Sequence, residues 1–116
     1  MAVRTDGTLW AWGDNNRGQL GDGSTSPHTV PTQVGSATIW RSVAIGGFCT
    51  VAVRTDGTLW TRGSNYKGQL GEGTTTDHLV PQHVGTATNW QIASAGGDSM
   101  AAIRTDGTLW AWGDNT

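Results

Sequence analysis

One seven-residue string occurs three times in this chain, at a constant spacing of fifty residues. Residues 4–10 read Arg-Thr-Asp-Gly-Thr-Leu-Trp, and residues 54–60 and 104–110 repeat them without change. The first and third copies continue identically as far as Asn15 and Asn115. Self-similarity at a period of 20 to 50 residues predicts a modular array, in which each unit buries its apolar face against its neighbours.

Each period reads as about four short strands. Residues 2–4 and 8–12 are strand-like, and the residues between them, 5–7, read Thr-Asp-Gly. An Asp-Gly pair between two such segments is a strong hairpin signal, so we expect a type I′ or similar turn that needs positive φ. A long glycine-rich connection follows, and residues 31–34 and 40–45 supply two further strands. The chain is therefore expected to be all-β.

The faces of the strands indicate how the sheets are arranged. Leu9 and Ala11 face one side of the hairpin strand, and Trp10 and Trp12 face the other, so both sides are expected to be covered. The last strand of each period carries small side chains, as a crowded common axis requires. Pro31 and its repeat equivalent suit an outer edge strand, because proline lacks a ladder donor. Radial four-stranded sheets of this kind form a β-propeller.

We therefore expect a β-propeller fragment of two to three four-stranded antiparallel blades, forming one array over residues 1–116. Residues 1–50 are repeat one, which lacks its inner strand, residues 51–100 are repeat two, and residues 101–116 begin a third. Met1 falls inside an expected strand, and we interpret the N-terminus as a truncation point. Open sheet flanks predict either self-association of copies or residence within a longer parent.

The repeat text resembles the regulator of chromosome condensation family, whose blades are about as long as this period. Arg62 departs from the pattern, because the flanking copies carry Trp12 and Trp112 there, and it would fill the gap between blades differently. The Thr-Asp-Gly-Thr-Leu-Trp style resembles bacterial members of the family. The resemblance covers essentially the whole chain and is carried by residues 51–53 (Val-Ala-Val), 55–60 (Thr-Asp-Gly-Thr-Leu-Trp), 63–65 (Gly-Ser-Asn), 68–71 (Gly-Gln-Leu-Gly), 81–84 (Pro-x-x-Val) and 95–97 (Ala-Gly-Gly).

Charge, hydropathy and cysteine content exclude several partners. Seven basic and nine acidic residues give a net charge of -2 without charge runs, so a nucleic-acid partner is not expected. No apolar stretch approaches the roughly 18 residues that span a bilayer, so a membrane partner is not expected either. Cys49 is the single cysteine, which rules out an intrachain disulfide and leaves the compartment open.

The polar residues do not form a recognisable catalytic, cofactor or metal motif. The aspartates of the Asp-Gly turns are explained by turn chemistry. Asp22 and Glu72 each lie between two glycines but lack the alternating ligands of a calcium loop. His28 and His78 lie one period apart and therefore on different blades, with His83 near His78, and no cysteine lies beside them to complete a zinc site; Cys49 has no activating neighbour. We therefore expect a protein that is not an enzyme and that has no cofactor and no bound metal.

The tryptophans are expected in the core rather than on a binding surface. They recur at equivalent repeat positions, as packing between blades predicts, and each buried indole contributes about 2–3 kcal/mol. The seven are Trp10, Trp12, Trp40, Trp60, Trp90, Trp110 and Trp112.

Recognition is expected where the repeats differ, because loops carry binding residues on a rigid frame. Residues 48–50 change from Phe-Cys-Thr to Asp-Ser-Met at 98–100, and residues 16–17 change from Asn-Arg to Tyr-Lys at 66–67. These two connections lie at the same end of an up-and-down sheet. The hypothesis for a protein-binding site therefore names Arg17, Phe48, Tyr66, Lys67 and Asp98.

The favoured function is that of a non-enzymatic propeller module that mediates protein–protein interaction, within a larger or self-assembled propeller. The resemblance permits a second function, guanine-nucleotide exchange on a small GTPase, although no residue specifically supports it. A third alternative is a duplicated or engineered fragment with no function beyond assembly, which the near-identity of the first and third hairpins also fits.

Overall fold

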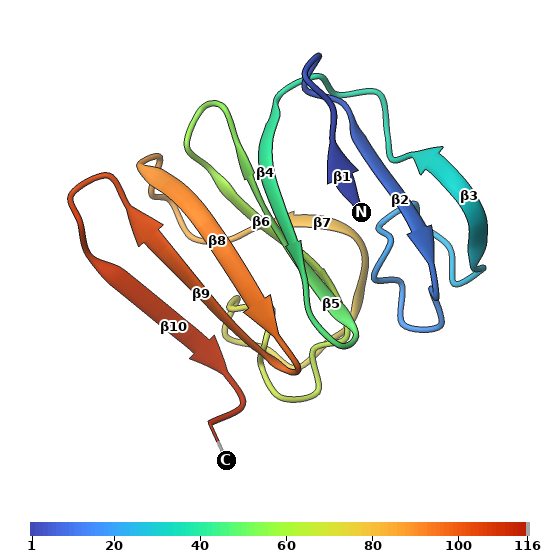
Figure 1. Ribbon diagram of the computed structural model, residues 1–116. Coiled ribbons are helices and arrows are strands. Elements are labelled where there is room, and N and C mark those ends of the chain that lie inside the picture. The colour runs from blue at the N-terminus through green and yellow to red at the C-terminus, as the bar shows by residue number, and fades with distance from the viewer. Residues whose placement is uncertain (116) are drawn as a thin grey trace.

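The computed structural model describes residues 1–115, and within that range every regular element is a β-strand. Three antiparallel sheets lie side by side, in the order β1-β2-β3, β4-β5-β6-β7 and β8-β9-β10 (Figure 1). The all-β expectation is confirmed. No helix in this range is long and apolar enough to cross a membrane. The strands are β1 (Ala2–Val3), β2 (Leu9–Gly13), β3 (His28–Gln33), β4 (Trp40–Ile45), β5 (Cys49–Arg54), β6 (Leu59–Gly63), β7 (His78–His83), β8 (Trp90–Gly96), β9 (Ser99–Arg104) and β10 (Leu109–Gly113).

The middle sheet shows what a full repeat looks like. It has four strands, each paired antiparallel with the next one along the chain. The first sheet has no strand equivalent to β4, and the third has none equivalent to β7 among residues 1–115. Pro31 lies in β3 and Pro81 in β7, the outer strands of their sheets, where no further strand needs an amide donor.

The repeated string forms a hairpin whose side chains are linked by hydrogen bonds. The Gly7 amide donates to the Arg4 carbonyl at 2.9 Å, and Gly7 has φ of +82°. Asp6 Oδ1 accepts from the Thr8 amide at 3.0 Å and from Thr8 Oγ1 at 2.6 Å. Trp10 Nε1 in turn donates to Thr8 Oγ1 at 2.8 Å. The turn carboxylate therefore orients the indole through Thr8, and the other two copies do the same.

The turn needs positive φ, as expected, but it is not of type I′. A type I′ turn needs positive φ at both central residues, here Thr5 and Asp6, but every residue with positive φ among those described is a glycine. The left-handed residue is the one after them, Gly7, as in a hairpin with a glycine bulge.

Two apolar clusters fill the gaps between neighbouring sheets. In each gap, apolar side chains of one sheet and its long connection pack against a tryptophan and other apolar residues of the next sheet. The first gap contains Leu9, Ala11, Leu20 and Val34 against Trp40 and Ala52; the second contains Val51, Val53, Leu59 and Leu70 against Trp90, Met100 and Ala102.

The tryptophans are less uniformly buried than expected. Trp40 and Trp90 are 4% and 5% exposed, which confirms their place in the core. Trp12 and Trp110 are 41% and 46% exposed, so the core assignment is wrong for these two. Trp12 faces the side of the first sheet that has no neighbouring sheet within residues 1–115. The same range has no outer strand beside Trp110, whereas Trp60 stacks on His83 of β7 at 5.0 Å.

Arg62 takes over the role of a tryptophan between the first and second sheets. Its side chain is 1% exposed, and its Nε donates to the Gln19 carbonyl at 3.2 Å. In the third sheet Trp112 Nε1 donates to the equivalent carbonyl of Gln69 at 2.9 Å. A Cβ at Gly21 would lie 2.0 Å from Arg62 Cδ, so glycine is required beneath it. Burial lowers the pKa of Arg62 to about 10.

Leu59 and Leu109 offer a matched pair that tests this packing. They sit in the same seven-residue string, yet Leu59 is fully buried and Leu109 is 71% exposed. We expect Leu59→Ala to lower the free energy of unfolding by about 2–5 kcal/mol, since it leaves a cavity. Leu109→Ala should change it by no more than about 0.5 kcal/mol. Denaturant unfolding of both variants measures this, and equal losses would contradict the arrangement of the sheets.

Candidate protein-binding face

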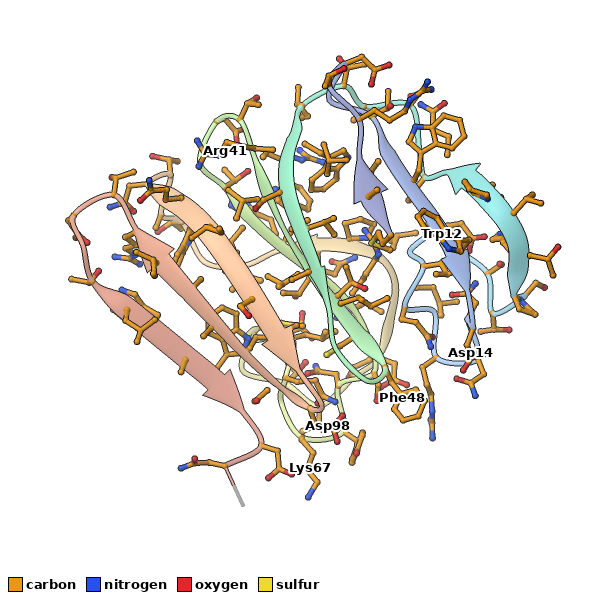
Figure 2. The ribbon with its side chains drawn as sticks, in the orientation of Figure 1. Trp12, Asp14, Arg41, Phe48, Lys67 and Asp98 are labelled. Atoms are coloured by element: carbon orange, nitrogen blue, oxygen red, sulfur yellow. The ribbon has the colours of Figure 1, made fainter. Side chains whose placement is uncertain are left out.

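The predicted binding residues lie on connections at one end of the sheets. The β4–β5 and β8–β9 turns and the long β2–β3 and β6–β7 connections gather at this end, and the Thr-Asp-Gly turns lie at the other (Figure 1). Figure 2 shows Phe48, Lys67 and Asp98 projecting there. We call the surface formed by Arg17, Phe48, Tyr66, Lys67 and Asp98 the connection face.

Three residues of the connection face are brought together across two blades. Tyr66 Oη donates to Asp98 Oδ2 at 2.5 Å, and Gln69 Nε2 donates to Asp98 Oδ1 at 3.2 Å. The hydrogen bond from Tyr66 to the Asp98 carboxylate is the first of the causes that raise the pKa of Tyr66. Lys67 Nζ lies 3.8 Å from Asp114 Oδ2. The β6–β7 connection is thereby tied to the turn and the strand end of the following blade.

The other two residues extend this face toward the first blade. Phe48 lies in the β4–β5 turn and is 40% exposed, while Tyr66 is 53% exposed. Arg17 Nη1 lies 4.0 Å from Asp77 Oδ2, which links the β2–β3 connection to the β6–β7 connection. The face thus presents two exposed aromatic rings among charged groups of both signs. Aromatic rings with charged neighbours are typical of protein-binding surfaces.

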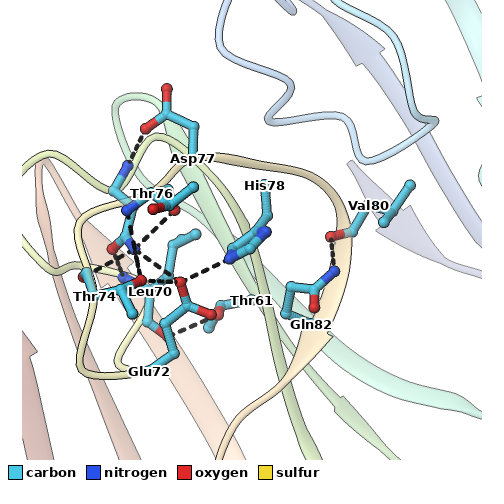
Figure 3. A network of polar contacts seen from close by, with 10 residues as sticks. Thr61, Leu70, Glu72, Thr74, Thr76, Asp77, His78, Val80 and Gln82 are labelled. Carbon is cyan, nitrogen blue, oxygen red and sulfur yellow. Dashed lines mark hydrogen bonds and ion pairs between the residues drawn. The ribbon is translucent and has the colours of Figure 1, made fainter.

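A buried asparagine holds each long connection in shape. Figure 3 shows the polar contacts of the β6–β7 connection. Asn65 is fully buried, and its Nδ2 donates to the carbonyls of Thr74 and Thr76 at 3.0 and 2.9 Å. Its Oδ1 accepts from the Leu70 backbone amide at 3.0 Å, and the backbone amide of Asn65 donates to Asp77 Oδ1 at 2.7 Å. A single side chain therefore satisfies three distant backbone groups, which makes the connection a rigid platform.

The same arrangement recurs in the first connection, where it was missed by sequence reasoning. Asn15 Nδ2 donates to the carbonyls of Ser24 and Ser26, and its Oδ1 accepts from the Leu20 amide. Gln19 Oε1 accepts from the Arg17 amide at 2.9 Å. The available signal was the repetition of both polar residues, fifty residues on, within otherwise glycine-rich loops.

The first residues of β3 and β7, His28 and His78, pair with carboxylates of the connections that precede them. His28 Nε2 lies 2.6 Å from Asp22 Oδ2, and His78 Nε2 lies 2.7 Å from Glu72 Oε1. Burial alone would raise the pKa of Asp22, but hydrogen bonds from His28, Ser24 and Asn15 outweigh it and lower the pKa to about 2. Within residues 1–115 no group of three or more ligating side chains could hold a metal ion. Each pair ties the start of an outer strand to the connection that precedes it.

Cys49 has the environment of a packing residue. It is fully buried at the start of β5, and its Sγ lies 3.9 Å from the Gly97 carbonyl. Burial, together with the charge of Asp98, raises the pKa of its thiol to about 11. The nucleophilic thiolate is therefore scarce at neutral pH.

The Asp22 pairing predicts a specific acid sensitivity. Because the folded-state pKa is about 2, against 3.8 ordinarily, the stabilisation is complete above about pH 4 and is lost as the pH falls through 2. Between pH 4 and pH 2, the free energy of unfolding should therefore fall less in Asp22→Asn than in the wild type. Denaturant titrations across this range test it, with Ser36→Ala as a control, because Ser36 is an exposed residue between β3 and β4, outside the pair. An unchanged pH slope in Asp22→Asn would contradict the pairing.

Comparison with family models gives a match to each period. A model of the regulator of chromosome condensation (RCC1) repeat matches residues 6–53 and again residues 56–103. A second model with the same description matches residues 40–69 and 91–116. Both periods predicted from the repeated string are thus matched by one repeat model.

Solved structures share the arrangement of the sheets. Human WBSCR16 matches with a TM-score of 0.85 and 27% identity over 96% of this chain. Prp20p from Saccharomyces cerevisiae matches with a TM-score of 0.83 and 21% identity over 97%. Yeast RCC1 (Prp20) bound to Kap60 matches with a TM-score of 0.80 and 21% identity over 97%. The match covers 29%, 30% and 29% of those chains, respectively. The fold is therefore a β-propeller fragment.

Proposed function

Since this chain belongs to the regulator of chromosome condensation (RCC1) repeat family, we propose that it is a non-enzymatic propeller module that binds another protein through its connection face. The observation that carries the proposal is the exposure of Phe48 and Tyr66 on connections that are otherwise tightly hydrogen-bonded. Exposed aromatic side chains on a rigid support lose little conformational entropy on binding.

The charged groups of the face set the orientation of the partner. Lys67 and Arg17 present cations beside Asp114 and Asp77, and Asp98 holds the Tyr66 hydroxyl. The two aromatic rings supply apolar area, and the surrounding ion pairs exchange with charges of the partner at the rim. No step of this recognition requires chemistry by the module.

The family comparison supports a protein as the partner. Prp20p is characterised by its binding to Gsp1p and histones, and the second yeast structure is a complex with Kap60. This chain matches less than a third of those yeast chains. Gsp1p, histones and Kap60 therefore serve here only as probe proteins in binding tests.

Two single substitutions test the connection face. We expect Phe48→Ala and Tyr66→Ala each to weaken partner binding about tenfold or more, as the loss of a central aromatic anchor does. Phe48→Ala should change the free energy of unfolding by no more than about 0.5 kcal/mol, because the ring is exposed. Tyr66→Ala also removes the hydrogen bond to Asp98 and should lower it by about 1 kcal/mol. Wild-type and variant chains serve as baits in affinity purification, followed by titration with the retained protein.

Val80→Ala is the matched control, because Val80 is also an exposed apolar residue but lies on an outer strand. A protein retained by the wild type and by the control, but lost from both aromatic variants, supports the proposal. A protein retained equally by all four baits places binding elsewhere. Stimulated nucleotide release from Gsp1p by this chain would show that it is an exchange factor instead of a binding module.

A further inference from the structure

A groove lies between the first sheet and the outer strand β7 of the middle sheet. The Gly23 amide donates to the Leu79 carbonyl at 3.1 Å, so the β2–β3 connection is held against β7. The groove has a volume of about 370 Å³, and both of its walls lie within residues 1–115. Its apolar lining is Val34 and Ala37 between β3 and β4, Trp40 of β4 and Pro81 of β7, and Arg54 of β5 also lines it.

The second gap between sheets has a cavity at the same repeat positions. Its volume is about 570 Å³. The packing of one repeat on the next therefore builds the groove. Within residues 1–115 only the first groove is lined by an outer strand, which is β7. The residues of the second cavity that lie fifty positions after residues of the first groove include Gly71, Val84, Ala87, Trp90 and Arg104.

Arg54 is held beside the first groove between two indole rings. Its guanidinium carbon lies 3.7 Å from the ring centre of Trp60 and 4.8 Å from that of Trp40. Its Nε is buried without a hydrogen-bond acceptor, and the side chain makes no hydrogen bond or ion pair within residues 1–115. A guanidinium carries five N–H donors, so the terminal N–H groups are left for an acceptor from outside the chain.

Donors without acceptors recur in the second gap. Arg104 lies over Trp90 at 4.7 Å and over Trp110 at 4.3 Å, and its Nε is also buried without an acceptor. The buried Nε1 of Trp90 has no acceptor either. Because buried donors in proteins normally have a partner, their recurrence at these positions indicates a groove that is rich in donors and short of acceptors.

The carboxylates close to Arg54 are engaged by other groups. Asp56 Oδ1 accepts from the amide and the hydroxyl of Thr58, at 3.0 and 2.6 Å, within its own turn. Asp22 lines the groove, but its Oδ2 lies 2.6 Å from His28 Nε2. Burial lowers the pKa of Arg54, although the charge of Asp56 acts in the opposite direction. The guanidinium therefore has no carboxylate partner within residues 1–115.

We propose that the first groove binds a small molecule with an apolar body and one carboxylate, and that this carboxylate accepts hydrogen bonds from the terminal N–H groups of Arg54. A guanidinium donates two parallel hydrogen bonds to a carboxylate in its own plane, which is compatible with indoles on its faces. The apolar body lies along Val34, Ala37 and Pro81. The volume of the groove is within the range of about 300–1,000 Å³ that small-molecule sites occupy.

The groove is separate from the connection face. None of the five residues of that face lines the groove. The inference therefore does not rest on the proposed function. Ligand binding in the groove and protein binding on the connection face can be measured independently.

Octanoate and 1-octanol form a matched pair of probes, because they share an alkyl chain and only octanoate carries a carboxylate. Each is titrated into the isotope-labelled full chain, and the signals of its N–H groups are followed by NMR. We expect octanoate to shift the amide signals of Val34 and Ala37 and the indole signals of Trp40 and Trp60. Its dissociation constant should be at least about tenfold lower than that of 1-octanol, because charge-assisted hydrogen bonds add to the same apolar contact.

Two substitutions separate the carboxylate contact from the apolar contact. Arg54→Gln should raise the dissociation constant of octanoate about tenfold or more and leave that of 1-octanol within about twofold. Ala37→Leu should abolish the shifts caused by both probes, because the larger side chain fills the groove. Ala87→Leu, at the equivalent position of the second gap, is the control and should leave binding in the first groove unchanged.

Melting curves check that the three variants are folded. If Arg54→Gln does not fold, the comparison of octanoate with 1-octanol on the wild-type chain decides the role of the carboxylate.

Equal dissociation constants for octanoate and 1-octanol overturn the inference, because the guanidinium then contributes nothing to binding. Shifts confined to the connection face or to the second gap overturn it as well, and so does the absence of any shift up to the solubility limits of the probes. Octanoate binding that Ala37→Leu leaves unchanged refutes the location. None of these outcomes decides whether the connection face binds a protein.

Discussion

The structure depends on the packing of each sheet against the next one. Leu59 is fully buried because Trp90 and its neighbours on the following sheet cover it, whereas Leu109, in the same local sequence, is 71% exposed. A hairpin alone could not bury its apolar face, so stability is a property of adjacent pairs of blades. The recurring string serves this packing, since Asp6 and Thr8 fix the indole of Trp10 by hydrogen bonds within the hairpin.

The packing of each sheet against the next also explains why the connection face can be rigid although it is polar. The long connections carry little regular structure, yet Asn15 and Asn65 satisfy their backbone groups from inside. Gln69 uses its carbonyl to anchor Trp112 of the next blade and its side-chain amide to hold Asp98. The residues that close the gap between blades therefore also position the connection face. Packing and the proposed recognition therefore depend on the same connections. The exposed side chains of these connections differ between repeats, while the buried asparagine and glutamine are the same in both.

Most of the fold was predictable, because repetition reports a structural period without any knowledge of contacts. The hairpins, the outer strands with Pro31 and the radial packing all follow from it. The need for positive φ in the Asp-Gly turn was predicted, but the turn type was not, since Asp-Gly is compatible with more than one hairpin and the φ values decide. The burial of Trp12 and Trp110 was mispredicted because equivalent positions in a repeat need not have equivalent neighbours. The sequence could not show that Tyr66 lies beside Asp98, because the two residues are 32 positions apart along the chain.

The sequence alone determined the period, the strand order within a blade and the family, because these depend on local turn chemistry and on recurrence. Tertiary structure decided which side chains are covered, and it decided that Arg62 could replace a tryptophan by donating to the Gln19 carbonyl. The physical reason is that burial belongs to the space between two sheets. A residue's own blade specifies only half of that space, and the neighbouring blade specifies the other half.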